Sequence, residues 1–562
     1  MWLLRFYDLN FVSQNQPQFP KRKGAFAKAK AMIMDMIKSL RAFIQNRMSA
    51  LVLALLVIQP AMDVLSYFLG EMGSNAFSTA LRFLLLALVA ALGFFVSSRK
   101  KIYFLFYGAV ALFWIAHALN CRRVGYQSFV ADTANFLRIL NFPIFTLSFI
   151  TFFQQGKEIQ KSIYLGFAIN CGEVLLFTAL PWILGRPVYT YERLQVGVLG
   201  WFSTPNAQSA IIVLVVPLTL LWLYRRGKYS LFLAGAVLSF ALLYVTGTKL
   251  TFYSIFIIAG AFAFLLALNL KKKSLKYVLP LLLIMVVTFV FRHQSPMDLR
   301  ERMSAYAQNN YGALVSESLM NSGADEELIR TIQNGFDAAN TSEEKLEQIR
   351  RSLIGVYTDK EVYGSFLKNM HDRFGVYNVM AAYNYTTEPS ILSDSRVRKS
   401  IFAKLVWEEQ DFATRLLGFE YSNMVMDDDI YDLENDFPAV YYFCGYLGFG
   451  LYLLLFLYLA FIILRAFFRD VASCVAERKG KQGNPILKGA GSFWQGVRRF
   501  LTLEMGAVGM TFLLAIIAAQ ISGNVLRRPN VTVYFAAASA CVYHLTVDLR
   551  RKETPHDLSG GF

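Results

Sequence analysis

The sequence predicts an all-α polytopic membrane protein with about twelve transmembrane helices. Hydrophobic residues make up 55% of the 562 residues, and charged residues make up only 17%. The apolar residues form long blocks, such as "LVLALLVIQPAMDVLSYFLG" (51–70) and "TFYSIFIIAGAFAFLLALNL" (251–270). Blocks of this length cross the ~30 Å hydrocarbon core of a bilayer as helices. Helices are expected because they satisfy every backbone polar group within the segment.

Twelve apolar blocks give the order of the spans. They lie near 49–69, 77–97, 102–119, 134–153, 163–185, 208–224, 229–246, 251–269, 274–291, 438–463, 503–521 and 530–546. The predicted organisation is a basic cytoplasmic N-terminus (1–48), helices one to nine (49–291), an extracytoplasmic helical loop domain (292–437), helices ten to twelve (438–546) and a cytoplasmic tail (547–562). Residues 25–48 alternate Met and Ile with Lys and Arg at helical spacing. This pattern favours an amphipathic helix on the inner leaflet, with a partner-binding or solvated helix as the alternative.

Charge predicts the orientation of these spans. Basic residues crowd the first 48 positions, the turns near 99–101, 225–228 and 271–273, and the 464–502 loop, so both termini are expected to be cytoplasmic. The 292–437 segment holds 25 of the 39 acidic residues and 15 of the 56 basic residues, a net charge of −10. We interpret the overall charge of +17 as an orientation signal beside anionic lipid, and expect no nucleic-acid partner.

Metal and cofactor motifs are not apparent in the sequence. The five cysteines and five histidines are dispersed, without the spacings of a disulfide framework, a zinc site or a nucleotide-binding loop. We therefore expect neither a metal nor a cofactor.

On the predicted topology, unusual residues gather at the outer face. The stretch "TYERLQVGVLGWFSTPNAQS" (190–209) precedes the sixth span and carries Arg193, Gly197, Gly200, Pro205 and Asn206. The turn "VTGTKL" (245–250) carries Thr246, Gly247 and Lys249. Cations are normally depleted from outer loops, yet Arg122, Arg123, Arg527 and Arg528 are predicted there. They indicate an anionic ligand, although an isolated arginine at a helix end commonly extends to lipid headgroups instead.

Four motifs in this order resemble the bacterial O-antigen ligase and polysaccharide polymerase family, the O-antigen ligase-like membrane proteins. The likeness covers roughly residues 49–546. The motifs are the threshold of Arg193, Gly197, Phe202, Pro205 and Asn206; the turn of Thr246, Gly247, Thr248 and Lys249; "RLLGFEYSN" (415–423) in the long outer loop; and Gly445 with Gly448 at the start of the tenth span.

The resemblance implies a GT-C-like, metal-independent, inverting glycosyltransferase in the bacterial cytoplasmic membrane. Such an enzyme transfers a saccharide from undecaprenyl diphosphate to an acceptor hydroxyl on the outer face. The implied partners are the lipid-linked donor, a glycan or wall-polymer acceptor and membrane lipids. Arg193 and Lys249 match the two diphosphate-binding basic residues of the family. Arg122, Arg527 and Arg528 are further candidates, because cations are normally depleted from outer loops. Cations suit this role because they stabilise charge developing on the leaving phosphate.

The catalytic candidates lie before the tenth span. Ligases of the family commonly place a His-Asn pair eleven residues before the first glycine of the closing motif. That position is Glu434 here, followed by Asn435 and Asp436. A carboxylate can accept the proton of the acceptor hydroxyl or orient that hydroxyl. The change from histidine favours a polymerase, or a ligase for another wall or capsular polymer, over a lipopolysaccharide ligase.

Less specific interpretations of the same residues stay open. The acidic run around Glu434 could be a solvated loop, and His371 is a weaker catalytic candidate. A transporter or flippase of lipid-linked oligosaccharide could also have twelve spans, with mid-span Asp63 and Glu173 lining a polar path. A non-catalytic scaffold for wall assembly is the third alternative.

Overall fold

The computed structural model describes residues 23–73, 75–156, 158–269, 275–358, 360–426, 429–478, 485–523 and 525–552. It divides into two compact units, Met1–Arg47 and Met48–Phe562. In the first unit, the described residues form the beginning of α1 (Lys23–Glu71) and expose the apolar side chains of Met32, Met36 and Phe43. A helix was expected over 25–48. The rest of the expected N-terminal segment, and the tail beyond residue 552, lie outside the described residues.

Eleven helices among the described residues are long and apolar enough to cross a membrane. They are α1, α2 (Asn75–Val96), α3 (Lys100–Val124), α4 (Phe129–Phe153), α5 (Ile159–Ile183), α6 (Pro205–Arg225), α7 (Tyr229–Thr246), α8 (Lys249–Leu268), α18 (Asp436–Arg478), α20 (Leu503–Ile521) and α21 (Pro529–Tyr543). The chain is therefore an all-α, multi-pass membrane protein.

Two expected spans differ from the observed helices. The ninth corresponds to α9 (Leu275–Val290), whose 16 residues rise only about 24 Å, less than the hydrocarbon core. The tenth continues beyond 463 because α18 runs on to Arg478, and α19 (Pro485–Phe500) follows. Much of the expected 464–502 loop is thus helical. Its basic residues suggested a loop, but residues 464–478 contain no glycine or proline to end the helix.

Two helices, α6 and α21, form the centre of the bundle. Residues 207–221 of α6 and 530–543 of α21 are buried throughout. A helix that is apolar on all sides belongs in the interior. Both helices begin with a proline, Pro205 and Pro529, which a first helical turn accepts because its amides lack partners within the helix.

Residues 292–435 form the loop domain between α9 and α18. Its elements are η3 (Arg292–Gln294), α10 (Pro296–Asn321), α11 (Glu326–Asn334), η4 (Ala338–Asn340), α12 (Glu343–Thr358), α13 (Lys360–Phe374), α14 (Val376–Ala382), α15 (Pro389–Leu392), α16 (Ser395–Glu408), α17 (Phe412–Leu417), η5 (Tyr421–Met424), β1 (Val425–Met426) and β2 (Asp429–Ile430). The two short strands pair antiparallel. Side chains of Ser295, Asp325, Asp394 and Asp411 cap four of the helices, as expected for short polar residues at helix starts.

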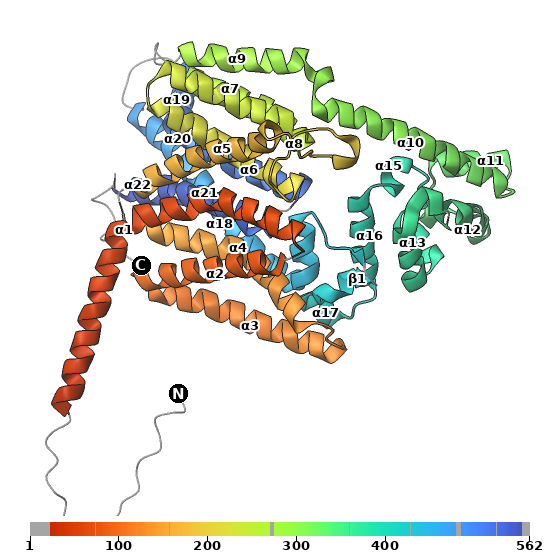
Figure 1. Cartoon of the computed structure of the whole chain (residues 1–562), viewed down its shortest axis with the longest axis horizontal. Coiled ribbons are helices and arrows are strands. Elements are labelled where there is room, and N and C mark those ends of the chain that lie inside the picture. The colour runs from red at the N-terminus through yellow and green to blue at the C-terminus, as the bar shows by residue number, and fades with distance from the viewer. Residues whose placement is uncertain are drawn as a thin grey trace, which may run out of the picture. The chain divides into compact units, whose positions relative to one another are not determined.

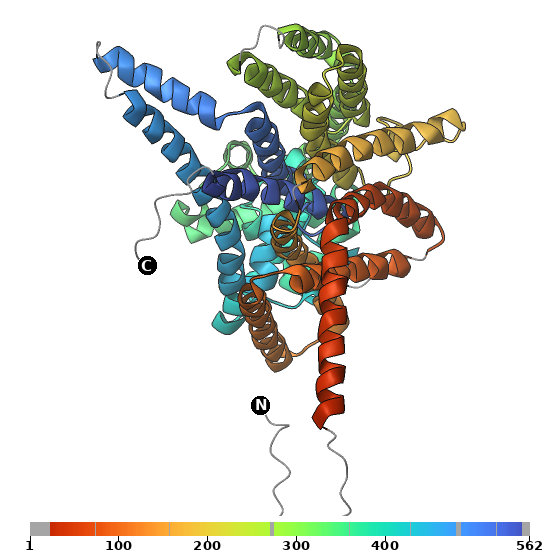
Figure 2. The ribbon, with the colours of Figure 1, turned by 90° about the vertical axis from the view of Figure 1, so that its left-hand side faces the viewer.

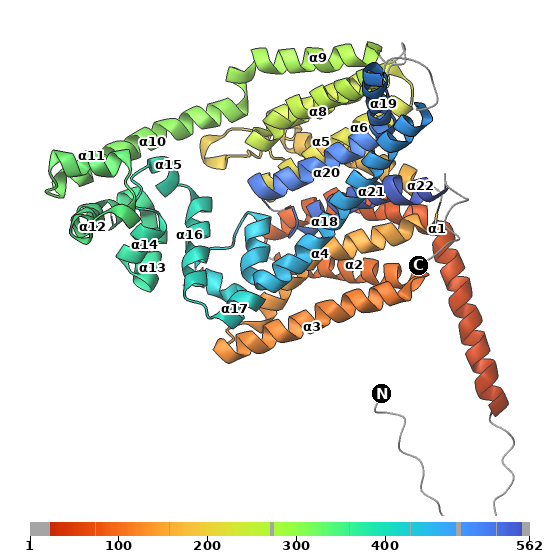
Figure 3. The ribbon, with the colours of Figure 1, turned by 180° about the vertical axis from the view of Figure 1, so that it is seen from behind.

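The loop domain lies at one end of the helix bundle, which we call the capped end (Figures 1 and 3). The opposite end carries α19, η6 (His544–Asp548) and α22 (Leu549–Lys552). Figure 2 shows the bundle from that opposite end, with the C-terminal helices near the centre. The loop from 184 to 204, which contains η1 (Glu192–Leu194), the turn from 246 to 249 and the loop from 522 to 528 all reach the capped end.

Two glycines join the loop domain to α18. Gly445 has a φ of 63° and interrupts the helical conformation of α18. A Cβ on Gly445 would overlap the Gly418 amide, and a Cβ on Gly418 would overlap the Phe443 carbonyl. The Phe419 amide also donates to the Tyr442 carbonyl oxygen at 3.2 Å. Glycine is therefore required on both sides of this junction.

Candidate functional site

The loop between α5 and α6 packs against the turn between α7 and α8. The Thr190 hydroxyl donates to the Thr246 carbonyl oxygen at 2.7 Å, and the Val198 amide donates to the Val245 carbonyl oxygen at 2.9 Å. Gly197 permits this approach, because a Cβ there would lie 2.7 Å from the Thr246 oxygen. The first two sequence motifs are thus in direct contact.

Arg193 and Lys249 both lie near this junction. Lys249 Nζ pairs with Glu301 Oε1 at 2.6 Å, while Arg193 is exposed. The Arg300 guanidinium lies over the Tyr191 ring, 4.7 Å from its centroid. Burial raises the pKa of Tyr191, and the nearby cations, Arg300 foremost, oppose that rise. No contact among the described residues joins the Arg193 and Lys249 side chains, so these two residues share a junction without touching.

Glu434 brings together side chains from three parts of the chain. Its Oε2 accepts hydrogen bonds from Arg396 Nε at 2.8 Å and Asn206 Nδ2 at 3.4 Å. Its Oε1 pairs with Lys399 Nζ at 3.1 Å. Burial raises the pKa of Glu434, but the charges of Lys399 and Arg396 outweigh burial and hold that pKa below its usual value. The α6 threshold therefore meets the loop-domain helix α16 at this carboxylate.

Asn435 adds an unpaired polar atom beside Glu434. Its Oδ1 is buried and has no hydrogen-bond partner among the described residues. A buried carbonyl oxygen without a partner is disfavoured unless water or a ligand donates to it. The backbone here is closely packed, because a Cβ on Gly523 would overlap the Glu434 carbonyl oxygen.

Asp436 and Arg527 hold the loop before α21. The Asp436 carboxylate accepts the amides of Val525 at 2.7 Å, Leu526 at 3.1 Å and Arg527 at 3.3 Å. Arg527 Nη1 also pairs with Asp432 Oδ1 at 2.8 Å. Asp436 is fully buried, and Arg527 is 4% exposed. Sequence reasoning placed Asp436 with the catalytic residues and Arg527 with the diphosphate ligands, whereas these contacts favour a positioning role for Asp436.

A polar cavity of about 410 Å³ lies at the capped end next to this loop. Four arginines line it: Arg82 from α2, Arg138 from α4, and Arg527 and Arg528 from the loop before α21. Hydroxyl and amide groups also line it, from Ser66, Ser78, Thr79, Ser203, Thr204 and Asn530, and the remaining wall comes from Asp432, Phe83 and Pro529. The cavity thus combines positive charge with hydrogen-bond donors.

Positive charge is crowded in this cavity. Burial lowers the pKa of Arg528, and the charges of Arg138 and Arg527 lower it further. Arg82 is balanced by Asp63 at 2.7 Å, but Arg138 has no ion-pair partner among the described residues. A bound anion would relieve the repulsion between these guanidinium groups. The cavity is therefore suited to a phosphate or diphosphate group.

The contact between Glu434 and Asn206 lies beside the cavity. Thr204 and Asp432 both line the cavity. Two residues further along each segment, Asn206 and Glu434 meet. A carboxylate and an anion-binding pocket are therefore adjacent at the start of α6.

Sequence reasoning missed Arg82 and Arg138. Both lie within apolar blocks, and an arginine inside a membrane span is itself a signal of function. The predicted diphosphate ligand Arg122 is exposed at the end of α3 and does not line the cavity. His371 lies in α13, where burial lowers its pKa. No contact among the described residues joins His371 to Glu434 or to the cavity.

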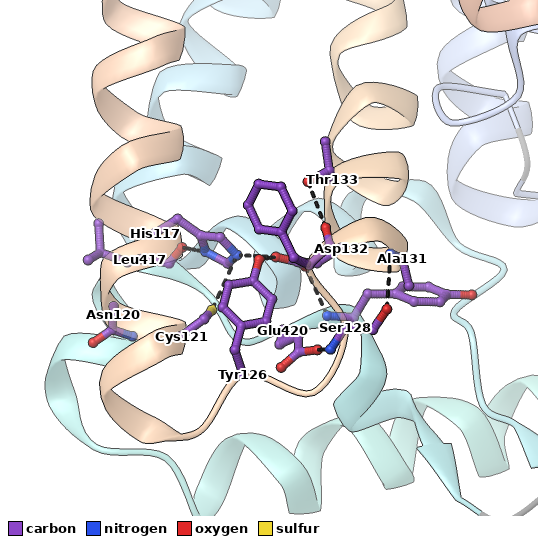
Figure 4. Close-up of polar contacts among 12 residues, drawn as sticks. His117, Asn120, Cys121, Tyr126, Ser128, Ala131, Asp132, Thr133, Leu417 and Glu420 are labelled. Atoms are coloured by element: carbon purple, nitrogen blue, oxygen red, sulfur yellow. Dashed lines mark hydrogen bonds and ion pairs between the residues drawn. The ribbon is translucent and has the colours of Figure 1, made fainter. Parts of the chain in front are cut away.

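A second buried cluster connects α3 and α4 to the loop domain (Figure 4). His117, Cys121 and Asp132 lie close enough together to hold a metal ion. The three side chains already have protein partners, however. His117 Nε2 is 3.0 Å from Asp132 Oδ2, and its Nδ1 is 2.9 Å from the Leu417 carbonyl oxygen. Asp132 Oδ1 accepts the Tyr421 amide at 3.0 Å. The cluster therefore joins the motif at residues 415–423 to the membrane helices α3 and α4, which lie about 300 residues earlier in the chain.

Comparisons with known proteins identify the family of the chain. The family model for O-antigen ligase like membrane proteins matches residues 45–476. No curated protein and no solved structure matches the chain. The matched region covers most of the chain, including the threshold, the turn before α8, the loop domain and the start of α18. The resemblance expected from the motifs is confirmed, and the chain belongs to the O-antigen ligase like membrane protein family.

Proposed function

We propose that the protein is a membrane glycosyltransferase that transfers a saccharide from undecaprenyl diphosphate to a hydroxyl of a glycan or wall-polymer acceptor. The family supports polysaccharide ligation or polymerisation. The observation that carries the proposal is the cavity lined by Arg82, Arg138, Arg527 and Arg528. A cluster of partly shielded guanidinium groups suits a diphosphate, because each can donate two parallel hydrogen bonds to phosphate oxygens.

In the proposed reaction, the bond between the anomeric carbon and the diphosphate oxygen breaks, and its electron pair leaves with the diphosphate. The cavity arginines stabilise the negative charge that develops there. Arg138 and Arg528 bind the phosphates directly. Arg527, held by Asp432 and Asp436, keeps the loop in place and contributes its charge. The acceptor oxygen attacks the opposite face of the sugar, so the reaction inverts the anomeric configuration. The arginines supply the positive charge that a metal ion would otherwise supply.

Glu434 is proposed to bind the acceptor hydroxyl. Its ion pairs with Arg396 and Lys399 make it a weak base before the reaction. The hydroxyl proton becomes acidic as the new bond to carbon forms, so a weak base in hydrogen-bond contact is sufficient to receive it. The unpaired Asn435 Oδ1 is a second acceptor for a sugar hydroxyl. The proton then passes to solvent or to the departing diphosphate.

Arg193 and Lys249 form a second candidate location for the donor phosphates, which does not include Arg122 at the end of α3. They lie at the same capped end, but the Lys249 charge is already compensated by Glu301 and Arg193 is exposed. An exposed cation binds phosphate less strongly than a shielded one because water screens it. We therefore assign the diphosphate to the arginine cavity and assign Arg193 and Lys249 to the path of the donor saccharide.

The decisive experiment compares Arg138→Ala with Arg122→Ala in purified protein supplied with a defined undecaprenyl-diphosphate saccharide. Products are identified by mass spectrometry. We expect Arg138→Ala to lower turnover by about 10²-fold or more, as does loss of other groups that stabilise a developing anion. Arg122→Ala is the matched control and should keep near wild-type turnover.

Other outcomes would assign the site differently. Loss of activity in Arg193→Ala with full activity in Arg138→Ala would move the diphosphate to the junction near Lys249. Movement of labelled donor across sealed vesicles, without new glycosidic bonds, would contradict the transferase proposal and support a flippase.

A further inference from the structure

Helix α3 is buried near its two ends but not along its middle. Its buried residues are Tyr103 near one end and His117, Asn120 and Cys121 near the other. The Tyr103 hydroxyl bonds Thr151 Oγ1 of α4 at 2.8 Å. About 21 Å of helix separates Tyr103 from His117, at 1.5 Å per residue. No residue described in that interval is buried.

A cavity of about 520 Å³ lies behind this middle stretch. Its walls come mainly from α3, α4 and α18, with Tyr543 of α21. They are overwhelmingly apolar, and include Ala109, Val110, Leu140, Leu147 and Leu451. Polar groups occur mainly at the end away from the capped end, where Ser97, Arg99 and Gln154 line the cavity. We call this cavity the α3 slot.

The α3 slot needs an apolar occupant. It lies within membrane-spanning helices, so its neighbourhood is hydrocarbon rather than water. Water is disfavoured in an apolar cavity that offers few hydrogen-bond partners. An empty cavity would forfeit the dispersion contacts of its walls. A lipid chain from the surrounding bilayer satisfies both conditions.

The mouth of the slot indicates which lipid enters. Arg99 is exposed there and has no ion-pair partner among the described residues. Lys101 is exposed two residues further along. An arginine at the level of the headgroups attracts anionic lipid and can bind a phosphate through two hydrogen bonds.

The slot is separate from the arginine cavity. Arg138 lines that cavity, while Phe136 and Leu140 line the slot. At about 100° per residue, Arg138 points about 200° away from each of them around α4. The two sites therefore lie on opposite faces of one helix, so the occupant of the slot is not the chain of a donor bound in the arginine cavity.

We propose that the α3 slot binds one acyl chain of an anionic phospholipid, with its phosphate on Arg99, from the leaflet opposite the capped end. The bound lipid completes the packing of α3 against α4 and α18. This site is independent of the proposed glycosyl transfer.

The test measures lipids that remain bound to the full-length protein after purification in mild detergent, using mass spectrometry. Ala109→Trp fills the slot, and Leu112→Trp is its matched control because Leu112 is 71% exposed. We expect about one anionic phospholipid per chain in the wild type and in Leu112→Trp, and at least a fivefold loss in Ala109→Trp. Arg99→Ala should keep a bound lipid but lose the preference for anionic headgroups.

A second measurement covers the case in which Ala109→Trp does not fold. Phosphatidylglycerol with a photoreactive acyl chain is added to the wild-type protein, and cross-links are mapped. Cross-links in α3, α4 and α18 that unlabelled phosphatidylglycerol displaces, but phosphatidylcholine does not, would support the proposal. Scattered cross-links, equal lipid retention in the two tryptophan variants, or a polyprenyl diphosphate as the retained lipid would overturn it.

Discussion

The neighbouring cations Lys399 and Arg396 favour the ionised form of Glu434. Because the folded-state pKa of Glu434 is lowered by Lys399 and Arg396, its ion pairs are fully formed above the ordinary glutamate value of about 4.3. They are lost only as the pH falls through the lower folded-state pKa. We expect the part of the turnover rate that depends on ionised Glu434 to stay constant from neutral pH down to about pH 4.3. At lower pH this part of the rate should be lost.

The variant Glu434→Gln isolates this contribution. It keeps a hydrogen-bond acceptor but cannot receive a proton or balance two cations, so turnover should fall from neutral pH down to about pH 4.3, where wild-type Glu434 is ionised. The acid decrease attributed to Glu434 should also disappear from the pH–rate profile. Wild-type turnover in this variant, or an unchanged acid limb, would remove Glu434 from the site.

Gly200 is constrained in two ways that matched variants can separate. Its φ is 75°, and a Cβ there would overlap the Thr178 backbone. Gly185 has a φ of 69°, but a Cβ there would have no neighbouring atom within 4 Å. Gly185→Ala should therefore cost only the backbone term, about 1–2 kcal/mol, and Gly200→Ala should cost clearly more. Thermal unfolding in detergent measures both, and equal shifts would show that the close contact with Thr178 does not matter.

At the scale of elements, the hairpin of α3 and α4 is anchored by its buried cluster rather than by its surface ion pair. Arg123 pairs with Asp411 at 2.5 Å, but both side chains are about half exposed, and such pairs contribute about 0–1 kcal/mol. His117 is 1% exposed and contacts both Asp132 and Leu417. Loss of His117 removes both the contact with the Leu417 carbonyl oxygen and one partner of the buried Asp132 carboxylate. That carboxylate then keeps only the Tyr126 hydroxyl and the Tyr421 amide as hydrogen-bond donors among the described residues.

We therefore expect His117→Ala to raise amide hydrogen exchange strongly in residues 415–423. The surface variant Arg123→Ala should change exchange there only slightly. Hydrogen exchange with mass spectrometry on both proteins measures the difference. If Arg123→Ala loosens this segment as much as His117→Ala, the buried cluster is not the anchor.

For the whole molecule, apolar length was sufficient to predict the helical membrane fold, and the order of the motifs was sufficient to predict the family. The predicted topology placed the threshold and the turn before α8 at the same end of the bundle, and the structure brings them into contact. The cavity did not follow, because Arg82 and Arg138 belong to spans that have no other charged residue and whose buried faces sequence alone does not assign. The partners of Glu434 could not be predicted either. Arg396 and Lys399 come from the loop domain, whose packing depends on long-range contacts.

The paired glycines 418 and 445 limit how the enzyme opens. Raising the loop domain like a lid would pull these two backbones apart and break the neighbouring amide–carbonyl bond between Phe419 and Tyr442. The loop domain is thus fixed in place where it joins α18. We therefore expect the proposed substrates to reach the site from the side, between the ends of the helices and the loop domain.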